Sequence, residues 1–154
     1  MDTTRMRTWA EIDLTALEHN YRTLRAMLPR ECRFLGLCKA NAYGHGAAVI
    51  GHTLERLGAD MLAVACVSEA EELRQSGVKL PILCLGETPE ELIPLLLELD
   101  VTQMVEDLET GRRLSAAAQR AGRTLRVHVK LDTGMSRLGF LWEAGREEET
   151  ADEI

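Results

Sequence analysis

The feature that most constrains the fold is a regular alternation of short apolar runs with amphipathic segments, which begins near residue 33. Apolar runs typical of buried strands lie at 33–38, 61–67, 81–85, 101–105 and 125–131. The segments between them favour helices near 46–57, 69–76, 89–99 and 108–121. Successive strands begin 20 to 28 residues apart, which is enough for a helical crossover to a parallel neighbour. The pattern predicts an α/β fold with about five parallel strands, in a single domain over residues 1–154.

Helix boundaries are marked by capping signals. Three residue pairs have the spacing of a capping box: Thr15 with Glu18, Ser68 with Glu71, and Thr88 with Glu91. Glycines that can adopt a left-handed conformation end three helices: Gly58, Gly77 and Gly122. The first helix follows a strand-like segment at 9–14 and carries an apolar stripe made of Leu14, Leu17, Tyr21, Leu24 and Leu28. The helix at 89–99 is apolar nearly all round, so it is a core helix, part of a subunit interface, or a surface that missing parts of the protein would cover.

The composition argues against several classes of protein. Lys and Arg total 18 against 25 Asp and Glu, a formal net charge of -7 that does not favour a nucleic-acid partner. No apolar run approaches the roughly 18 residues of a membrane span, and residues 1–5 lack the apolar core of a signal peptide. The four cysteines lack the CxxC spacing of a metal site. We therefore expect a cytoplasmic protein with reduced cysteines, no metal, and no membrane or nucleic-acid partner.

Lys39, at the end of the first predicted strand, is the main candidate for chemistry. Tyr43 follows four residues later, in a stretch that Asn41, Gly44 and Gly46 allow to turn tightly. Burial lowers the pKa of a lysine, and its neutral amine can attack an aldehyde or remove a proton. The position alone leaves open a surface lysine whose charged end reaches solvent.

Residues 39–46, with the sequence KANAYGHG, closely resemble the cofactor-binding signature of bacterial alanine racemases, which are enzymes of fold type III that use pyridoxal 5′-phosphate (PLP). The opening of the chain, up to WAEIDLTALEHN at residues 9–20, also resembles the start of these enzymes. The resemblance implies that Lys39 carries PLP covalently and is the catalytic base on one face of the substrate. It also implies that Tyr43 binds the cofactor phosphate, and that the chain forms part of a (β/α)8 TIM barrel.

The fifth predicted strand has two unlike faces. Apolar residues alternate with Arg126, His128, Lys130 and Asp132. The polar face therefore either enters a barrel interior or lies on an exposed edge strand. Residues 130–139, KLDTGMSRLG, resemble a second motif of the same racemases. That resemblance implies that Arg137 binds PLP and the substrate carboxylate, and that Lys130 is carbamylated. A carbamate would accept hydrogen bonds from a guanidinium that an unmodified lysine would repel.

The resemblance covers residues 5 to 140 or so and implies an isomerase that interconverts L-alanine and D-alanine, supplies D-alanine for the cell wall, and works as a homodimer. A complete barrel has eight strands and about 250 residues. We therefore expect the later barrel strands, the C-terminal β domain and the opposite-face base to be absent from this chain, and the chain alone to be inactive. The alternatives are a serine racemase of the same fold and a non-catalytic PLP-binding or assembly module. The small single-barrel PLP-homeostasis proteins fit the two motifs less well.

Overall fold

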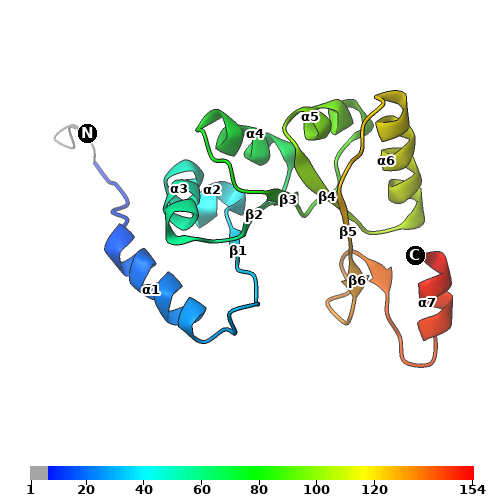
Figure 1. The fold of residues 1–154 in the computed structure, drawn as a ribbon, viewed down its shortest axis with the longest axis horizontal. Coiled ribbons are helices and arrows are strands. Elements are labelled where there is room, and N and C mark those ends of the chain that lie inside the picture. The colour runs from blue at the N-terminus through cyan, green and yellow to red at the C-terminus, as the bar shows by residue number, and fades with distance from the viewer. Residues whose placement is uncertain (1–6) are drawn as a thin grey trace.

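The computed structural model describes residues 7–154. Residues 1–6, which include the stretch 1–5 considered above for a signal peptide, lie outside the described part. The main element is a sheet of five parallel strands in the order β1-β2-β3-β4-β5 (Figure 1). The strands are Leu35–Leu37 (β1), Met61–Val64 (β2), Ile82–Cys84 (β3), Val101–Val105 (β4) and Val127–Val129 (β5). Strands that are neighbours in the sheet are also successive in the chain, as in an arc of a (β/α)8 barrel. The predicted fold class is therefore confirmed.

Helices connect the strands and cover one face of the sheet. They are α1 (Leu14–Ala26), α2 (Lys39–Tyr43), α3 (Ala47–Leu57), α4 (Val67–Gln75), the 3₁₀ turn η2 (Glu90–Leu92), α5 (Ile93–Glu98), α6 (Leu108–Arg120) and α7 (Glu147–Glu153). Two short strands, β6 (Leu131–Asp132) and β7 (Phe140–Leu141), form a separate parallel pair. In Figure 1, α4 and α5 lie above the sheet and α6 lies at its right. The core lies between these helices and the sheet, where Leu62, Ile82, Leu73 and Leu96 are completely buried.

The first strand is more exposed than the sequence predicted. In β1 only Gly36 is buried, whereas Leu35 and Leu37 are 41% and 38% exposed. A Cβ at Gly36 would lie 2.5 Å from Leu54 Cδ1, so this residue faces α3 and the two leucines lie on the other, concave face. The expectation of a first strand buried on both faces is therefore wrong, because the concave face is open at the edge of the arc.

The fifth strand combines both alternatives considered from its sequence. Val127 and Val129 are 45% and 47% exposed, as on an edge strand. Together with Leu114 of α6 they line a groove of about 420 Å³ on the helical side. His128 and Lys130 face the concave side, where they line another cavity. Thus β5 is an edge strand whose polar face points into the arc.

All three predicted capping boxes are wrong. The N-cap of α1 is Asp13, whose Oδ1 accepts hydrogen bonds from the backbone N–H groups of Thr15 and Ala16 at 2.8 and 3.1 Å. The N-cap of α4 is Cys66, so Ser68 lies within the helix. Thr88 is buried and its hydroxyl donates to Gln103 Oε1 at 2.8 Å. Asp13 therefore replaces Thr15 as the cap of α1, whereas Cys66 makes no side-chain capping hydrogen bond and the Thr88 hydroxyl is engaged in the core.

The glycines predicted to end helices do adopt the expected conformation. Gly58, Gly77 and Gly122 all have positive φ, at 89°, 99° and 62°, so the expected left-handed conformations are confirmed. The expected strand-like segment at 9–14 is wrong over residues 9–13, which have neither strand nor helix, and α1 begins at Leu14.

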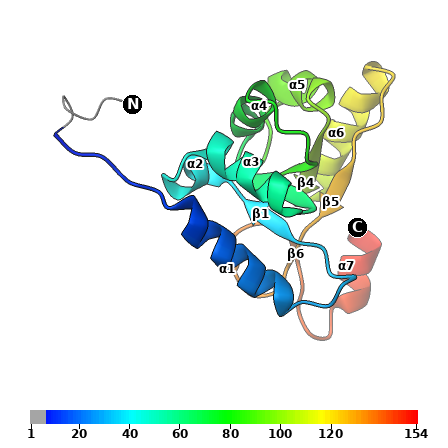
Figure 2. The same cartoon turned by 60° about the vertical axis from the view of Figure 1, so that its left-hand side comes forward.

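Helix α1 lies against α3 and beside β1 (Figure 2). Tyr21 is buried and its ring meets that of Phe34 edge to face, with centroids 4.8 Å apart. Elsewhere the predicted apolar stripe is uncovered, since Leu14, Leu24 and Leu28 are 37%, 53% and 38% exposed. Only the middle of this stripe packs on the rest of the chain.

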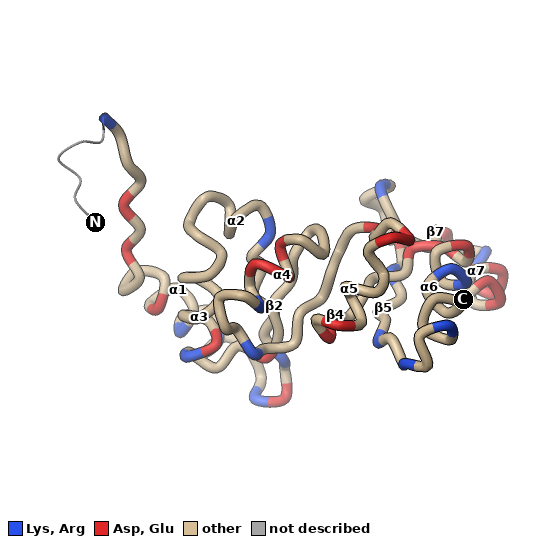
Figure 3. The backbone as a smooth tube through the Cα atoms, turned by 90° about the horizontal axis from the view of Figure 1, so that it is seen from above, with Lys and Arg blue, Asp and Glu red and all other residues tan. Residues whose placement is uncertain are grey.

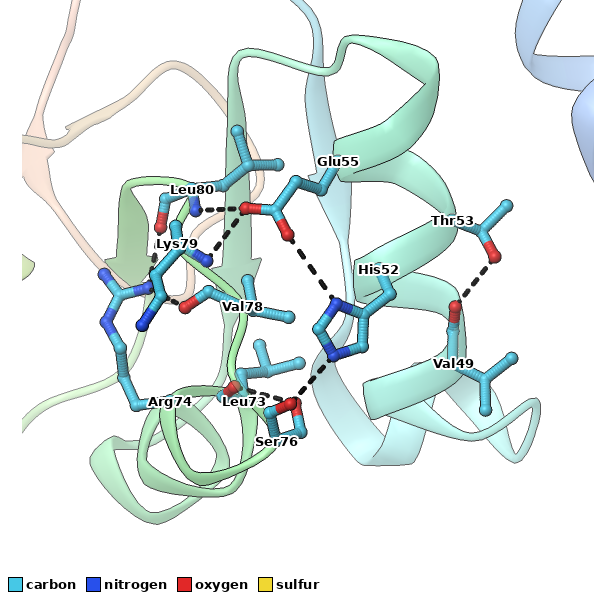
Figure 4. Close-up of polar contacts among 10 residues, drawn as sticks. All are labelled: Val49, His52, Thr53, Glu55, Leu73, Arg74, Ser76, Val78, Lys79 and Leu80. Carbon is cyan, nitrogen blue, oxygen red and sulfur yellow. Dashed lines mark hydrogen bonds and ion pairs between the residues drawn. The ribbon is translucent and has the colours of Figure 1, made fainter.

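Polar side chains fix the loop between α4 and β3 (Figure 4). Glu55 of α3 accepts from the backbone N–H groups of Lys79 and Leu80 at 2.8 and 3.0 Å. His52 Nε2 lies 2.9 Å from the carbonyl oxygen of Ser76, and Arg74 Nη1 donates to the carbonyls of Val78 and Leu80. These contacts hold α3, α4 and the start of β3 together.

The leucine-rich helix expected at 89–99 is divided into η2 and α5. Ile93, Leu96 and Leu97 are buried, so α5 is a core helix of this chain.

Along the tube in Figure 3, Lys and Arg are interspersed with Asp and Glu, and acidic residues gather in α7. Among residues 7–154, none of the helices has both the length and the hydrophobicity needed to cross a bilayer.

Candidate active site

The residues singled out from the sequence follow the carboxyl ends of the two edge strands. Lys39 comes two residues after the end of β1, and Lys130 directly follows β5. Arg137 lies in the loop between β6 and β7. Parallel strands end at the same edge of a sheet, and this edge carries the active site in (β/α)8 barrels. The topology therefore places both sequence motifs at the functional edge.

Lys39 is the first residue of α2, which is an unusual left-handed turn and not an ordinary right-handed helix. Ala40, Asn41, Ala42 and Tyr43 all have φ between 52° and 54°. For residues other than glycine this conformation costs about 1–2 kcal/mol each, so the surrounding contacts must hold it. Asn41 Oδ1 accepts from the backbone N–H of Ala47 at 2.7 Å, which ties the turn to the start of α3. The sequence predicted a tight turn from Asn41, Gly44 and Gly46, which all have positive φ, but not that Ala40, Ala42 and Tyr43 would share this conformation.

Glu69 of α4 holds the other side of this turn. Its Oε1 accepts from the backbone N–H of Ala40 at 2.6 Å, and its Oε2 accepts from that of Ala65 at 2.7 Å. Ala65 directly follows β2, so one carboxylate connects the ends of two neighbouring strands. Sequence reasoning missed this residue, because a glutamate in the first turn of a helix is common for its favourable interaction with the helix dipole.

Lys39 and Tyr43 lie together, as the sequence predicted. Lys39 Nζ lies 5.7 Å from the centre of the Tyr43 ring, within the range of a cation–π contact. Tyr43 is 60% exposed and Lys39 is half-buried, so neither has the deep burial expected for Lys39. The pair can present a primary amine and a phenolic hydroxyl to one ligand beyond the carboxyl end of β1.

Lys130 and Arg137 also share one place. Both line a cavity of about 410 Å³ on the concave face, together with His128 and apolar residues of β3 and β4. The lining does not include Lys39 or Tyr43. The structure therefore brings the four predicted residues together as two pairs, one beyond each edge strand of the arc.

The loop that carries Arg137 is built around Asp132. This residue is 6% exposed, and its Oδ1 accepts from the backbone N–H groups of Gly134 and Ser136 at 3.0 and 2.9 Å. These hydrogen bonds, from Ser136 first and then Gly134, lower the pKa of the Asp132 carboxyl. Gly139 ends the loop with φ 117°, and a Cβ there would lie 2.8 Å from the carbonyl oxygen of Lys130. The loop is thus fixed against β5 at both of its ends.

A second carboxylate missed by sequence reasoning lies next to Lys130. Glu106 directly follows β4 and is 9% exposed. The backbone N–H of Lys130 donates to the carbonyl of Val105, the residue before Glu106, at 2.9 Å. Glu106 and Lys130 are therefore neighbours at the ends of adjacent strands. Burial is the main cause that raises the pKa of Glu106, and the negative charges of Glu87 and Asp107 raise it further. The positive charge of Lys130 lowers this pKa. Within residues 7–154, Glu106 Oε2 is buried without a hydrogen-bond partner.

The donor set at this edge fits an anionic aldehyde better than a metal ion. It comprises an amine, a phenol and a guanidinium, which suit a carbonyl carbon, a phosphate and a carboxylate respectively. In the described part of the chain, His, Cys, Asp and Glu form no group of three or more that could hold a metal ion. The residues therefore suit a phosphorylated carbonyl cofactor such as PLP.

Comparison with known proteins gives one consistent family. The family model described as "Alanine racemase, N-terminal domain" matches residues 12–152. The alanine racemase of Desulfovibrio desulfuricans is 44% identical over 131 residues, which cover 85% of this chain and 35% of that protein. That of Methanococcus maripaludis is 43% identical over 135 residues, covering 88% of this chain and 36% of that protein. The chain thus spans about a third of the length of the curated relatives it matches.

Solved structures agree with the sequence comparison. Alanine racemase from Clostridium difficile 630, in complex with cycloserine, has a TM-score of 0.90 and 41% identity over 97% of this chain and 40% of that one. A histidine racemase from Leuconostoc mesenteroides has a TM-score of 0.77 and 27% identity, covering 92% of this chain and 37% of that one. The same architecture therefore occurs in racemases named for different amino acids.

Proposed function

This chain belongs to the alanine racemase family, and on that premise we propose that it supplies the PLP-anchoring part of an enzyme that interconverts L-alanine and D-alanine. The observation that carries the proposal is the placement of Lys39 with Tyr43, and of Lys130 with Arg137, beyond the carboxyl ends of parallel strands. Both pairs also belong to the motifs that resemble the family signature. The proposed product, D-alanine, is a cell-wall precursor.

Each side chain has a role that its chemistry supports. Lys39 would hold the cofactor through its amine and move the α-proton on one face of the amino acid. Tyr43, which is largely exposed, would present its hydroxyl to the phosphate. Arg137 would bind the cofactor's phenolic oxygen and the substrate carboxylate, because a guanidinium matches a carboxylate with two parallel hydrogen bonds. PLP, when bound, supplies an electron sink for the α-carbon.

Lys130 is proposed to be carbamylated. It shares a cavity with Arg137, and two cations in one cavity repel each other. A carbamate would convert Lys130 into an acceptor that orients the Arg137 guanidinium. Lys130 would then act through Arg137 and not on the substrate itself.

Assembly is part of the proposal. The edge strands β1 and β5 present backbone groups that a sixth strand or another chain could pair with. The exposed residues Leu14 and Leu24 of α1, with Leu28 just after the helix, add an apolar surface that favours association. We therefore expect a homo-oligomer, with a small amino acid as the substrate.

Two alternatives have specific support. The likeness to a histidine racemase indicates that the fold accepts other side chains, so a serine racemase is the second candidate. A non-catalytic PLP-binding or assembly module is the third, because the cavity near β5 is not lined by Lys39 or Tyr43. This chain would then bind the cofactor without turnover.

Reductive trapping tests the proposal. The purified chain is incubated with PLP, reduced with borohydride, digested and analysed by mass spectrometry. We expect the pyridoxyl label mainly on Lys39, and its loss in a Lys39→Ala variant. A label found mainly on the exposed Lys79, and unchanged in that variant, would contradict the proposal.

A further inference from the structure

The carboxylate of Glu69 is the only side-chain group in the described part of the chain that bonds both Ala40 and Ala65. Each of its oxygens takes one backbone N–H, at 2.6 Å for Ala40 and 2.7 Å for Ala65. Hydrogen bonds from backbone N–H groups to an ionised carboxylate are stronger than those between neutral groups. Glu69 is half-buried; its hydrogen bond to Ala65 is partly buried and that to Ala40 is exposed. One charged side chain therefore joins the ends of β1 and β2.

The bond to Ala40 falls at the point where the backbone turns. Ala40 directly follows Lys39 and is the first of the four left-handed residues. A left-handed run of this length needs contacts that over-determine it, and such strain is concentrated at functional sites. Asn41 holds the far side of the turn through Ala47, and Glu69 holds the near side. The Cα–Cβ direction of Lys39 is thereby fixed from the residue next to it.

The negative charge of Glu69 also affects Cys38, the residue between β1 and Lys39. Burial, followed by the negative charge of Glu69, raises the pKa of the Cys38 thiol to about 11. Cys38 directly precedes Lys39 and is completely buried. Glu69 thus acts on the residues on both sides of Lys39.

We propose that Glu69 is a positioning residue for Lys39, and that the reaction of the Lys39 amine with an aldehyde cofactor depends on the two hydrogen bonds of the Glu69 carboxylate. The proposal rests on the proposed function in that it takes Lys39 as the reactive amine. Glu69 itself does not touch the reacting atoms. It acts by holding the left-handed turn.

The chain offers a variant and two matched controls. Glu69→Gln keeps the side-chain shape but replaces one acceptor oxygen with an NH₂ group, so at most one of the two backbone bonds survives. Glu72→Gln, on an exposed position of the same helix, removes the same charge without touching the turn. Leu73→Ala, at a completely buried position of α4, lowers stability without removing the carboxylate.

The first measurement needs no cofactor. Amide hydrogen exchange, read residue by residue, should show faster exchange at Ala40, at Ala65 or at both in Glu69→Gln, but at neither in Glu72→Gln. The second measurement is the rate of borohydride-trapped PLP incorporation. We expect Lys39 labelling to fall about tenfold or more in Glu69→Gln, since hydrogen bonds to charged groups contribute enough for that factor. Labelling of Lys79 should not change.

The controls separate positioning from stability. In Leu73→Ala the melting temperature should fall while the ratio of Lys39 to Lys79 labelling stays at the wild-type value. Should Glu69→Gln fail to fold, Glu69→Asp is used, whose shorter side chain keeps the charge but cannot span both amides. Wild-type exchange at Ala40 and wild-type Lys39 labelling in the folded Glu69 variant would overturn the proposal. If wild-type protein is not labelled at Lys39, the proposed function fails, and the exchange measurement still decides whether Glu69 holds the turn.

Discussion

At the scale of single residues, the two motifs identified side chains that the structure does bring into pairs. The motifs could not reveal Glu69 or Glu106, because both act on chain segments distant in sequence. Glu69, for example, lies 29 residues from the amide of Ala40. Asn41 indicated a turn, but the motifs could not reveal that the left-handed run extends over 40–43, because alanine and tyrosine give no local sign of positive φ. The candidate reactive side chains could be predicted from the sequence, whereas the hydrogen bonds that position them depend on the fold.

The charge state of Lys130 gives the first residue-scale prediction. A carbamate at Lys130 would lie next to the buried carboxylate of Glu106, and two neighbouring anions disfavour each other. Replacing Glu106 with Gln should therefore increase carbamylation of Lys130. Carbon NMR in ¹³C-labelled bicarbonate measures the carbamate, with Lys130→Ala as the control for its assignment. An equal carbamate signal in wild type and Glu106→Gln would show that Glu106 does not influence Lys130.

The second residue-scale prediction concerns Asp132 and pH. Its pKa in the folded chain is lowered from an ordinary value of 3.8, so its ionised form stabilises the loop at pH values above that. The contribution is lost as the pH falls below 3.8 and through the folded-state pKa. Asp132→Asn, which removes the charge, should be less stable than wild type near neutral pH, and the difference should shrink in acid. Urea unfolding across this pH range measures it, and a pH-independent difference would contradict the assignment.

At the scale of elements, hydrophobic periodicity predicted the existence and order of the five strands, and β4 matches its predicted bounds. Periodicity reports which residues face a core, so it succeeds wherever a core is present. It failed at β1, where the concave face is open, and along α1, where most of the apolar stripe is uncovered. The three capping boxes also failed, because several residues near a helix start can serve as the cap, although α6 begins at Leu108 as predicted.

The start of α1 provides an element-scale prediction. The structure assigns the N-cap to Asp13, whereas the sequence suggested Thr15. Asp13→Ala should lower the free energy of unfolding by about 0.5–2 kcal/mol, because two backbone N–H groups lose their acceptor. Thr15→Ala should have little effect, since Thr15 contributes its backbone N–H. Chemical denaturation of both variants checks this, and the reverse order of effects would restore Thr15 as the cap.

At the scale of the whole molecule, the described chain forms an arc with two pairs of candidate site residues beyond its edge strands. The barrel architecture explains why both pairs lie at one edge of the sheet, and the family comparison places the arc at the N-terminal part of longer racemases. Racemisation requires one proton-transfer group on each face of the α-carbon. Lys39 is the proposed group on one face. In the part of the chain that the structure describes, Tyr21 is buried against Phe34 and Tyr43 is assigned to phosphate, which leaves neither for the opposite face.

Exchange of the α-proton therefore tests the central claim, that this chain carries a cofactor-linked base for one face only. The chain, saturated with PLP, is incubated in D₂O with L-alanine and, separately, with D-alanine, and Lys39→Ala serves as the control. We predict Lys39-dependent uptake of deuterium at the α-carbon, with conversion between enantiomers slower by about 10²–10⁴-fold, the usual loss when a positioned acid–base group is missing. Conversion as fast as exchange would show that another group, such as His128 in the cavity beside Arg137, acts on the opposite face. Exchange that persists in Lys39→Ala would contradict the assignment of Lys39 itself.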